Sequence, residues 1–305
     1  MIIIKKFQSL IEWSKLANKY GISLAEVVVK MEASASRKSE AEIKQKMYNN
    51  LTVMKKSIED GLKKTTPTMG GLADREAAKV HSAIKNGLIP DDRISKVSYR
   101  ALAVSELNAT MGCVVAAPTA GACGILPAIL VTVAEEKNSS EEDLIDALFV
   151  AAGIGIVIAQ KATLSGAEGG CQAECGSAAS MAAGAAVYLS KGTPEQVLDA
   201  AALALKNSLG LVCDPVAGLV EVPCINRNAA LAVQALAAAD LALAGVKSVI
   251  PADEVISAMS EIGKDMASKY KETAGGGLAT TPTGKKIMNK ILGGSSALQK
   301  GRTGS

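Results

Sequence analysis

The sequence predicts an all-α protein, and three observations support this prediction. Hydrophobic residues make up 49% of the 305 residues, yet there are only 2 Phe, 1 Trp and 5 Tyr, so the core must be aliphatic. Alanine and glycine are abundant, which favours closely packed helices over a β-sandwich. Helix start signals recur along the chain, whereas strand signals are weak throughout. We therefore expect a single helical domain with a buried central layer of helices.

Capping patterns locate several of these helices. Ser23-Leu24-Ala25-Glu26 is a capping box ahead of an apolar run, and Thr193-Pro194-Glu195-Gln196 adds a proline at the first helical position. The second pattern begins a helix that extends to about Asn207. Pro251 begins another, to about Tyr270. Further helices are expected at 5–19, 40–60, 72–86, 95–110, 121–136, 176–190 and 225–244.

The most apolar segment predicts a buried helix. Ser140 is followed by Glu141, Glu142 and Asp143, which suit the positive end of a helix through Lys161. Its centre, 147–159, is an uninterrupted apolar run of 13 residues, short of the roughly 20 needed to cross a bilayer. We therefore expect a core helix and no membrane span.

The chain divides into three regions by composition. Residues 1–65 are charged and amphipathic, typical of an outer helical layer or a partner-facing arm. Residues 66–292 contain the small, apolar centre, and 293–305 are rich in Gly and Ser, typical of a flexible tail.

Charge and the amino terminus exclude several functional classes. The net charge is +3 and no block of five or six like charges occurs, which argues against nucleic-acid or membrane-surface binding. The first six residues contain too short an apolar run for a signal peptide, so we expect a cytoplasmic location. The only histidine is His81, which lies among helical residues and is read as a surface or packing residue, so a Ser–His–Asp triad or a multi-histidine metal site would be hard to build from this chain alone.

Six cysteines are the main candidates for chemistry, because cytoplasmic cysteines are thiols, metal ligands or catalytic groups rather than disulfides. Cys171 lies in a Gly-rich loop, Cys213 precedes Asp214-Pro215 at the end of a helix, and Cys224 begins the next helix. Helix amino termini stabilise the thiolates that iron–sulfur clusters require. From spacing alone the set stays open: these three with Cys175 could form a closed four-thiolate site, or all six could be inert. Cys113 and Cys123 lie among small apolar residues.

Four segments resemble signatures of the iron–sulfur L-serine dehydratase family. They are 117–127 (APTAGACGILP), 165–178 (SGAEGGCQAECGSA), 210–228 (GLVCDPVAGLVEVPCINRN) and 262–280 (IGKDMASKYKETAGGGLAT). The likeness runs from about residue 20 to 290, over essentially the whole α subunit of the two-subunit enzymes. The resemblance implies an all-helical fold and a 4Fe-4S cluster held by Cys171, Cys213 and Cys224. Cys113, Cys123 and Cys175 fall at positions that family members often fill with small residues.

The resemblance also implies a reaction. Three thiolates on four irons leave one iron open as a Lewis acid that eliminates water from L-serine, giving pyruvate and ammonia in amino-acid catabolism and gluconeogenesis. An open iron implies oxygen sensitivity. Candidates for the base, by residue type and neighbourhood, are Lys161, Glu168 and Lys269, although a solvated or structural charge is the simpler explanation for each. Asn226 and Arg227 could orient the substrate carboxylate, hydrogen-bond the cluster sulfurs or cap the helix.

A second chain is implied as well. Family enzymes combine the cluster half with a smaller β subunit or β domain that carries a Ser-Ser-Ser-His-Thr motif, and this motif is absent here. Single-chain relatives also carry a cysteine after the Gly-Gly-Leu-Ala stretch, where this chain has Thr280-Thr281. Gln160-Lys161 replaces a polar, often Asn-rich pair of the family. A heterodimer with a separate β subunit is therefore expected.

Two other functions are compatible with the sequence. A related cluster-dependent L-cysteine desulfidase would bind sulfur at the same open iron. A non-catalytic redox or sensing protein would need a fourth ligand, for which Cys175 is the obvious choice.

Overall fold

The computed structural model describes residues 4–300, and this part of the chain forms thirteen α-helices and no strand. The predicted all-α, single-domain fold is confirmed. In chain order the helices are α1 (Leu10–Tyr20), α2 (Leu24–Ser36), α3 (Glu40–Lys63), α4 (Glu76–Lys85), α5 (Arg93–Ala109), α6 (Ile125–Lys137), α7 (Glu141–Lys161), α8 (Gly166–Gly169), α9 (Ser177–Leu189), α10 (Pro194–Lys206), α11 (Cys224–Leu243), α12 (Ala252–Asp265) and α13 (Pro282–Lys300).

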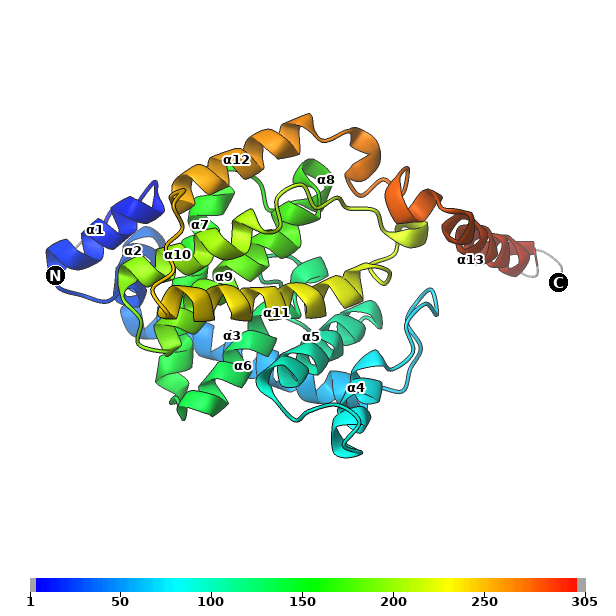
Figure 1. The fold of residues 1–305 in the computed structure, drawn as a ribbon, viewed down its shortest axis with the longest axis horizontal. Helices are drawn as coiled ribbons and strands as arrows, with labels where there is room; N and C mark the ends of the chain where they lie inside the picture. Colours follow the sequence, from blue (N-terminus) through cyan, green and yellow to red (C-terminus); the bar gives the residue numbers. More distant parts are fainter. Residues whose placement is uncertain (1–3, 301–305) are drawn as a thin grey trace.

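Helix α9 is the centre of the molecule. Of its 13 residues only Tyr188 is not fully buried, and it packs against α6, α7, α10 and α11 (Figure 1). Most of its side chains are Ala, Gly or Ser, so the neighbouring helices can approach closely and fill the space between them. This arrangement explains why so few aromatic residues suffice for the core.

The predicted buried helix is α7, and its bounds agree with the prediction. Ser140 caps its first turn: the Ser140 hydroxyl accepts from the Asp143 backbone N–H, and the Asp143 carboxylate accepts from the Ser140 N–H. The capping boxes predicted at Ser23 and Thr193 are also present.

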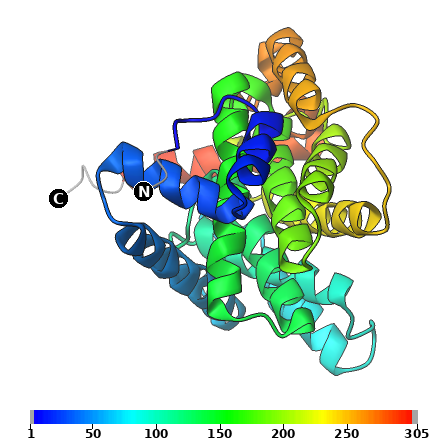
Figure 2. The same ribbon diagram turned by 90° about the vertical axis from the view of Figure 1, so that its left-hand side faces the viewer.

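The first 65 residues contribute to the core. Figure 2 shows α1, α2 and α3, in blue, against the green α7. The Trp13 indole is fully buried, stacks on Phe7 with ring centroids 5.6 Å apart, and donates to the Leu24 carbonyl at 3.1 Å. Contact of their outer faces with a partner remains a prediction.

The carboxyl-terminal third differs from the sequence expectation. Helix α12 ends at Asp265 rather than near Tyr270, because Met266 and Ala267 adopt extended backbone before the short turn Ser268–Tyr270. Helix α13 was not predicted, and it continues through the first part of the expected Gly/Ser-rich tail, while 301–305 lie outside the described residues. Figure 1 shows α13 at the end of the molecule opposite α1.

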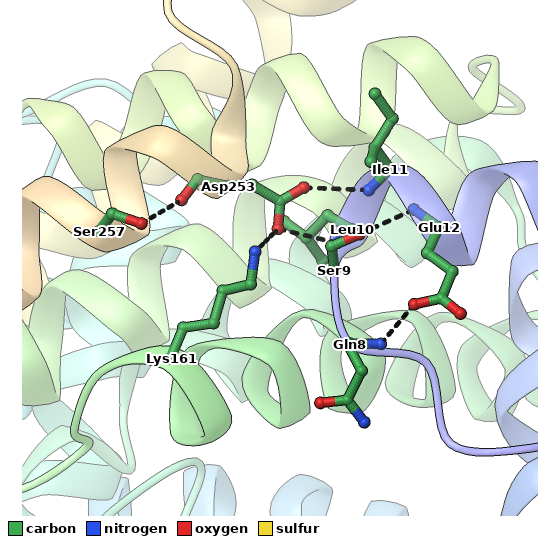
Figure 3. A network of polar contacts seen from close by, with 8 residues as sticks. All are labelled: Gln8, Ser9, Leu10, Ile11, Glu12, Lys161, Asp253 and Ser257. Atoms are coloured by element: carbon green, nitrogen blue, oxygen red, sulfur yellow. Dashed lines mark hydrogen bonds and ion pairs between the residues drawn. The ribbon is translucent and has the colours of Figure 1, made fainter.

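One carboxylate joins three helix ends (Figure 3). Asp253, in the first turn of α12, accepts from the Leu10 and Ile11 backbone N–H groups at 3.0 and 3.1 Å, and from Lys161 Nζ at 2.9 Å. The carboxylate thus meets the positive end of α1, which Ser9 also caps, and fixes the end of α7.

Asp253→Ala is expected to lower the free energy of unfolding by about 1–2 kcal/mol, because two backbone N–H groups and an ammonium lose their shared acceptor. Urea unfolding of the cluster-free protein measures this change. Glu261→Gln, at an exposed position of the same helix, is the control and should shift stability by less than about 0.5 kcal/mol. An Asp253→Ala variant as stable as the control would contradict this role.

Candidate functional site

Three cysteines from separate segments converge at one site. Cys171 follows the glycine-rich loop, Cys213 lies in the loop after α10, and Cys224 is the first residue of α11. All three are free thiols; Cys171 and Cys213 are buried and Cys224 is half-buried. Burial, followed by the negative charge of Cys171, raises the pKa of Cys224 to about 12 and raises the pKa of Cys213 further. The charge of Cys171 therefore acts on both of the other sulfurs.

Backbone hydrogen bonds hold two of the cysteine segments side by side. The Gln172 N–H, next to Cys171, donates to the Leu211 carbonyl at 3.0 Å. On the other side, the Cys213 N–H donates to the Tyr270 carbonyl at 2.8 Å and its carbonyl accepts from Glu272 N–H at 3.0 Å. The 270–272 segment thereby covers the Cys213 loop.

Arg227 links the Cys213 and Cys224 segments. Its guanidinium donates to the Val212 carbonyl and to Asp214, each at 2.8 Å, and Asp214 in turn accepts from Leu278 N–H at 2.8 Å. Burial alone would lower the pKa of Arg227, but the negative charges of Cys171 and Asp214 raise it. Arg227, one of the residues predicted from the sequence, thus lies beside Cys171. Its guanidinium group is used to hold the Cys213 loop against the start of α11. The side chain of Asn226, the neighbouring candidate, is exposed.

Asn228 was not singled out from the sequence, although it ends the 210–228 segment. It is fully buried, accepts from Gly124 N–H at 3.0 Å, and donates to the carbonyls of Gly121 and Cys224 at 2.8 and 2.9 Å. It therefore attaches the 117–124 loop to the first turn of α11.

Glu174 is a second residue that the sequence reasoning missed. It lies in the π-helical turn Gln172–Gly176, between Cys171 and α9, and its Oε1 accepts from the Thr119 hydroxyl at 2.8 Å. Burial, and then the charge of Glu272, raises its pKa. Its position inside the cysteine-containing segment 165–178 was the sequence feature that could have identified it as a site residue.

Two glycines leave the space that these side chains occupy. A Cβ on Gly166 would lie 2.5 Å from Glu174 Oε2 and 3.3 Å from Cys213 Sγ. Gly170 has φ +77°, and a Cβ there would meet the sulfur of Met266 at 2.6 Å and the carbonyl of Leu211 at 2.9 Å. The Gly-rich loop is therefore required for close approach of backbone to the cysteines.

The other three cysteines have different surroundings. Cys175 is fully buried and donates a hydrogen bond to the Cys171 sulfur; this bond, with the charge of Arg227, lowers the pKa of Cys171 and raises that of Cys175 well above its usual value. Cys113 is exposed, and Cys123 packs in a separate apolar cluster with Ile58 and Val104. In this arrangement Cys175 acts as a donor to Cys171.

Each of the three candidate bases contacts another side chain of this chain. Lys161 pairs with Asp253, Glu168 is exposed and accepts from the Thr163 hydroxyl at 2.5 Å, and the Lys269 ammonium lies 5.0 Å from the Tyr270 ring centroid. These contacts are what a solvated or structural charge would make, and a role of any of the three residues as the catalytic base remains a prediction.

The donor set of this site consists of thiols. Between residues 4 and 300, no three His, Cys, Asp or Glu side chains converge closely enough to hold one metal ion. A cubane presents separate irons to separate thiolates, so its ligands need not meet at a point. Three free thiols on separate segments and an adjacent guanidinium are donors and charges that suit such a cluster.

A buried carboxylate supports the turn before Cys224. Glu221 is only 2% exposed and accepts from the Thr68 hydroxyl at 2.6 Å and from the N–H groups of Leu72 at 2.9 Å and Gly70 at 2.5 Å. All three donors belong to the 68–72 loop, which is thereby fixed against the cysteine segment.

Glu221→Gln is expected to lower the free energy of unfolding by about 2–3 kcal/mol, because the amide NH₂ would face donors and leave at least one of them unpaired. Urea unfolding monitored by circular dichroism measures the change, with Glu261→Gln as the matched exposed control. Equal stability of the two variants would show that the 68–72 loop does not depend on this carboxylate.

Comparison with known proteins places the chain in a family. The sequence model described as serine dehydratase alpha chain matches residues 19–279. The chain belongs to the serine dehydratase alpha chain family. It is 45% identical over 289 residues to the probable L-serine dehydratase alpha chain of Bacillus subtilis, covering 94% of this chain and 96% of the relative. It is 44% identical over 278 residues to the L-serine dehydratase alpha chain of Peptoniphilus asaccharolyticus, covering 91% and 95%.

A third relative has a different length. L-serine dehydratase 1 of Escherichia coli is 41% identical over 283 residues, which are 90% of this chain but only 61% of that protein. The serine dehydratase alpha chain family thus includes relatives that match this chain over nearly their whole length and others that carry a substantial additional part.

Along residues 4–300, no helix combines the length and apolar character of a membrane span.

Proposed function

We propose that this chain is the cluster-bearing α subunit of an L-serine dehydratase, an ammonia-lyase that converts L-serine to pyruvate and ammonia. The observation that carries the proposal is the convergence of Cys171, Cys213 and Cys224 in a chain of this family. We further propose a cytoplasmic enzyme of amino-acid catabolism and gluconeogenesis that works with a separate β subunit.

Cys171, Cys213 and Cys224 are the residues proposed to hold a 4Fe-4S cluster. When bound, a cluster with one iron lacking a protein thiolate supplies a Lewis acid for the departing hydroxyl group of serine. Arg227 favours the ionised form of Cys171 and fixes the Val212–Asp214 loop, while Cys175 donates to the Cys171 sulfur. Hydrogen bonds to ligand sulfurs stabilise their negative charge and orient them.

The reaction also needs removal of the Cα proton. Loss of this proton and of hydroxide gives 2-aminoacrylate, which tautomerises and hydrolyses to pyruvate and ammonia. Lys161, Glu168 and Lys269 each have another partner in this chain, which favours a base supplied by the β subunit.

The proposal is tested with the anaerobically reconstituted chain, combined with a β subunit from a two-subunit relative. We expect pyruvate release from L-serine to exceed that from L-cysteine, and we expect exposure to air to abolish it until iron and thiol are restored. Preference for cysteine would indicate the desulfidase alternative, and activity that survives prolonged air exposure would contradict the open iron.

The non-catalytic alternative makes a distinct prediction. A redox or sensing protein would have Cys175 as a fourth ligand, whereas we propose that this thiol supports the Cys171 sulfur as a hydrogen-bond donor. Added serine would then leave the cluster's spectrum unchanged.

A further inference from the structure

The carboxylate of Glu174 lies between the cysteines and the 117–124 loop. Its Oε1 is held by the Thr119 hydroxyl, while its Oε2 lies against Gly166. Cys213 Sγ lies on the same side of this glycine, since both atoms lie within 3.3 Å of the position a Gly166 Cβ would take. The free oxygen and the sulfur are therefore no more than about 6 Å apart.

This carboxylate lacks a cationic neighbour. Within residues 4–300, no Lys or Arg forms an ion pair with Glu174, and the charge that acts on it is another carboxylate, Glu272. A partly buried carboxylate beside a second carboxylate is costly without a cation. Its neighbours thus favour a positively charged ligand group at Oε2.

An amino-acid substrate carries one such group. Of the three functional groups of zwitterionic serine, the hydroxyl and carboxylate suit a metal or a hydrogen-bond donor, and only the α-ammonium is cationic. An ammonium held at Oε2 would place the rest of the molecule beside Cys213, within reach of the proposed cluster site.

We propose that Glu174 is the positioning residue that binds the α-ammonium group of the substrate, with Thr119 fixing the carboxylate in place. This inference rests on the proposed function and deepens it, because it makes this chain select 2-amino acids over 2-hydroxy acids of the same shape. Glycine at position 166 is required because any side chain there would fill the space between Oε2 and Cys213.

The test compares L-serine with L-glycerate, which keeps the carboxylate and the β-hydroxyl but has a neutral hydroxyl in place of the ammonium. Binding is measured on the reconstituted chain as the perturbation of the cluster's absorption and electron paramagnetic resonance spectra. Glu174→Gln, which keeps the Thr119 bond, should weaken serine binding about 10- to 100-fold, the usual effect of losing a charged hydrogen bond, and change glycerate binding by less than about threefold. Glu261→Gln should match the wild type with both ligands.

Glu174→Asp is the second variant, and iron and sulfide content verify that each variant carries cluster. It keeps the charge but shortens the side chain, so serine binding should fall less than in Glu174→Gln. Equal weakening of serine and glycerate, or no weakening of either in both variants, would overturn the inference. With the β subunit present, Glu174→Gln should raise KM for serine more than it lowers kcat; a fall in kcat with KM unchanged would instead make Glu174 an acid or base and would also overturn it.

The outcomes separate this inference from the proposed function. If the wild-type complex dehydrates serine and Glu174→Gln retains its preference for serine over glycerate, the function stands and the ammonium site falls. If serine binds in a Glu174-dependent manner but is never converted to pyruvate, the function falls and the ammonium site stands. If serine does not perturb the wild-type cluster, both fall.

Discussion

Replacing any one of Cys171, Cys213 and Cys224 with serine is expected to abolish stable cluster assembly and to reduce serine dehydration by at least about 100-fold. Even residues that only support metal ligands typically cost 10- to 100-fold when they are changed, and a ligand should cost more. The three cysteines come from three segments, which are held together by Arg227, Asn228 and the 270–272 segment. Loss of one thiolate therefore cannot be compensated by a shift of its neighbours.

Iron and sulfide content and the visible absorbance after anaerobic reconstitution measure this effect. Cys113→Ser and Cys123→Ser are the controls, because one thiol is exposed and the other packs in a separate apolar cluster. Cys175→Ser should keep the cluster as well, since a hydroxyl can still donate to the Cys171 sulfur. A Cys175→Ser protein without cluster would overturn the proposed ligand set.

The second large effect is the dependence of serine dehydration on the β subunit. The isolated chain should assemble its cluster and bind serine, yet it should release no pyruvate above background until a β subunit is added. The physical reason is that we expect the β subunit to supply the base, since Lys161, Glu168 and Lys269 each contact another group of this chain. In the Escherichia coli relative L-serine dehydratase 1, the matched residues make up 61% of the protein.

Titration of the reconstituted chain with purified β subunit measures this dependence, with pyruvate release followed under anaerobic conditions. Activity should rise to a plateau as the α chain becomes saturated. Full serine dehydration by the reconstituted chain alone would contradict the account and would return the base to a residue of this sequence.

The fold could be predicted because its determinants are local. Capping boxes at Ser23 and Thr193 and the apolar run of α7 mark helices directly, and the structure confirms them. Helix α13 escaped prediction because Gly293-Gly294-Ser295-Ser296 has low helix propensity, while the end of α12 was placed too late because Met266 gives no breaking signal.

The candidate site was only partly predictable. Cysteine positions in Gly-rich or helix-start settings identified the segments, but spacing along the chain could not show which thiols meet. Glu174, Asn228 and Glu221 act through contacts with residues 55, 107 and 153 positions away in sequence, which no local pattern encodes. Lys161, conversely, was singled out by its neighbourhood in sequence, whereas in the structure it pairs with Asp253.

Mössbauer spectroscopy of the ⁵⁷Fe-reconstituted chain tests the central claim most directly, because it distinguishes irons by their ligands. Three cysteine ligands on a four-iron cluster predict one iron distinct from the other three, and only that iron should change when L-serine is added. Four equivalent irons that do not respond to serine would show a closed four-thiolate cluster and would contradict the account.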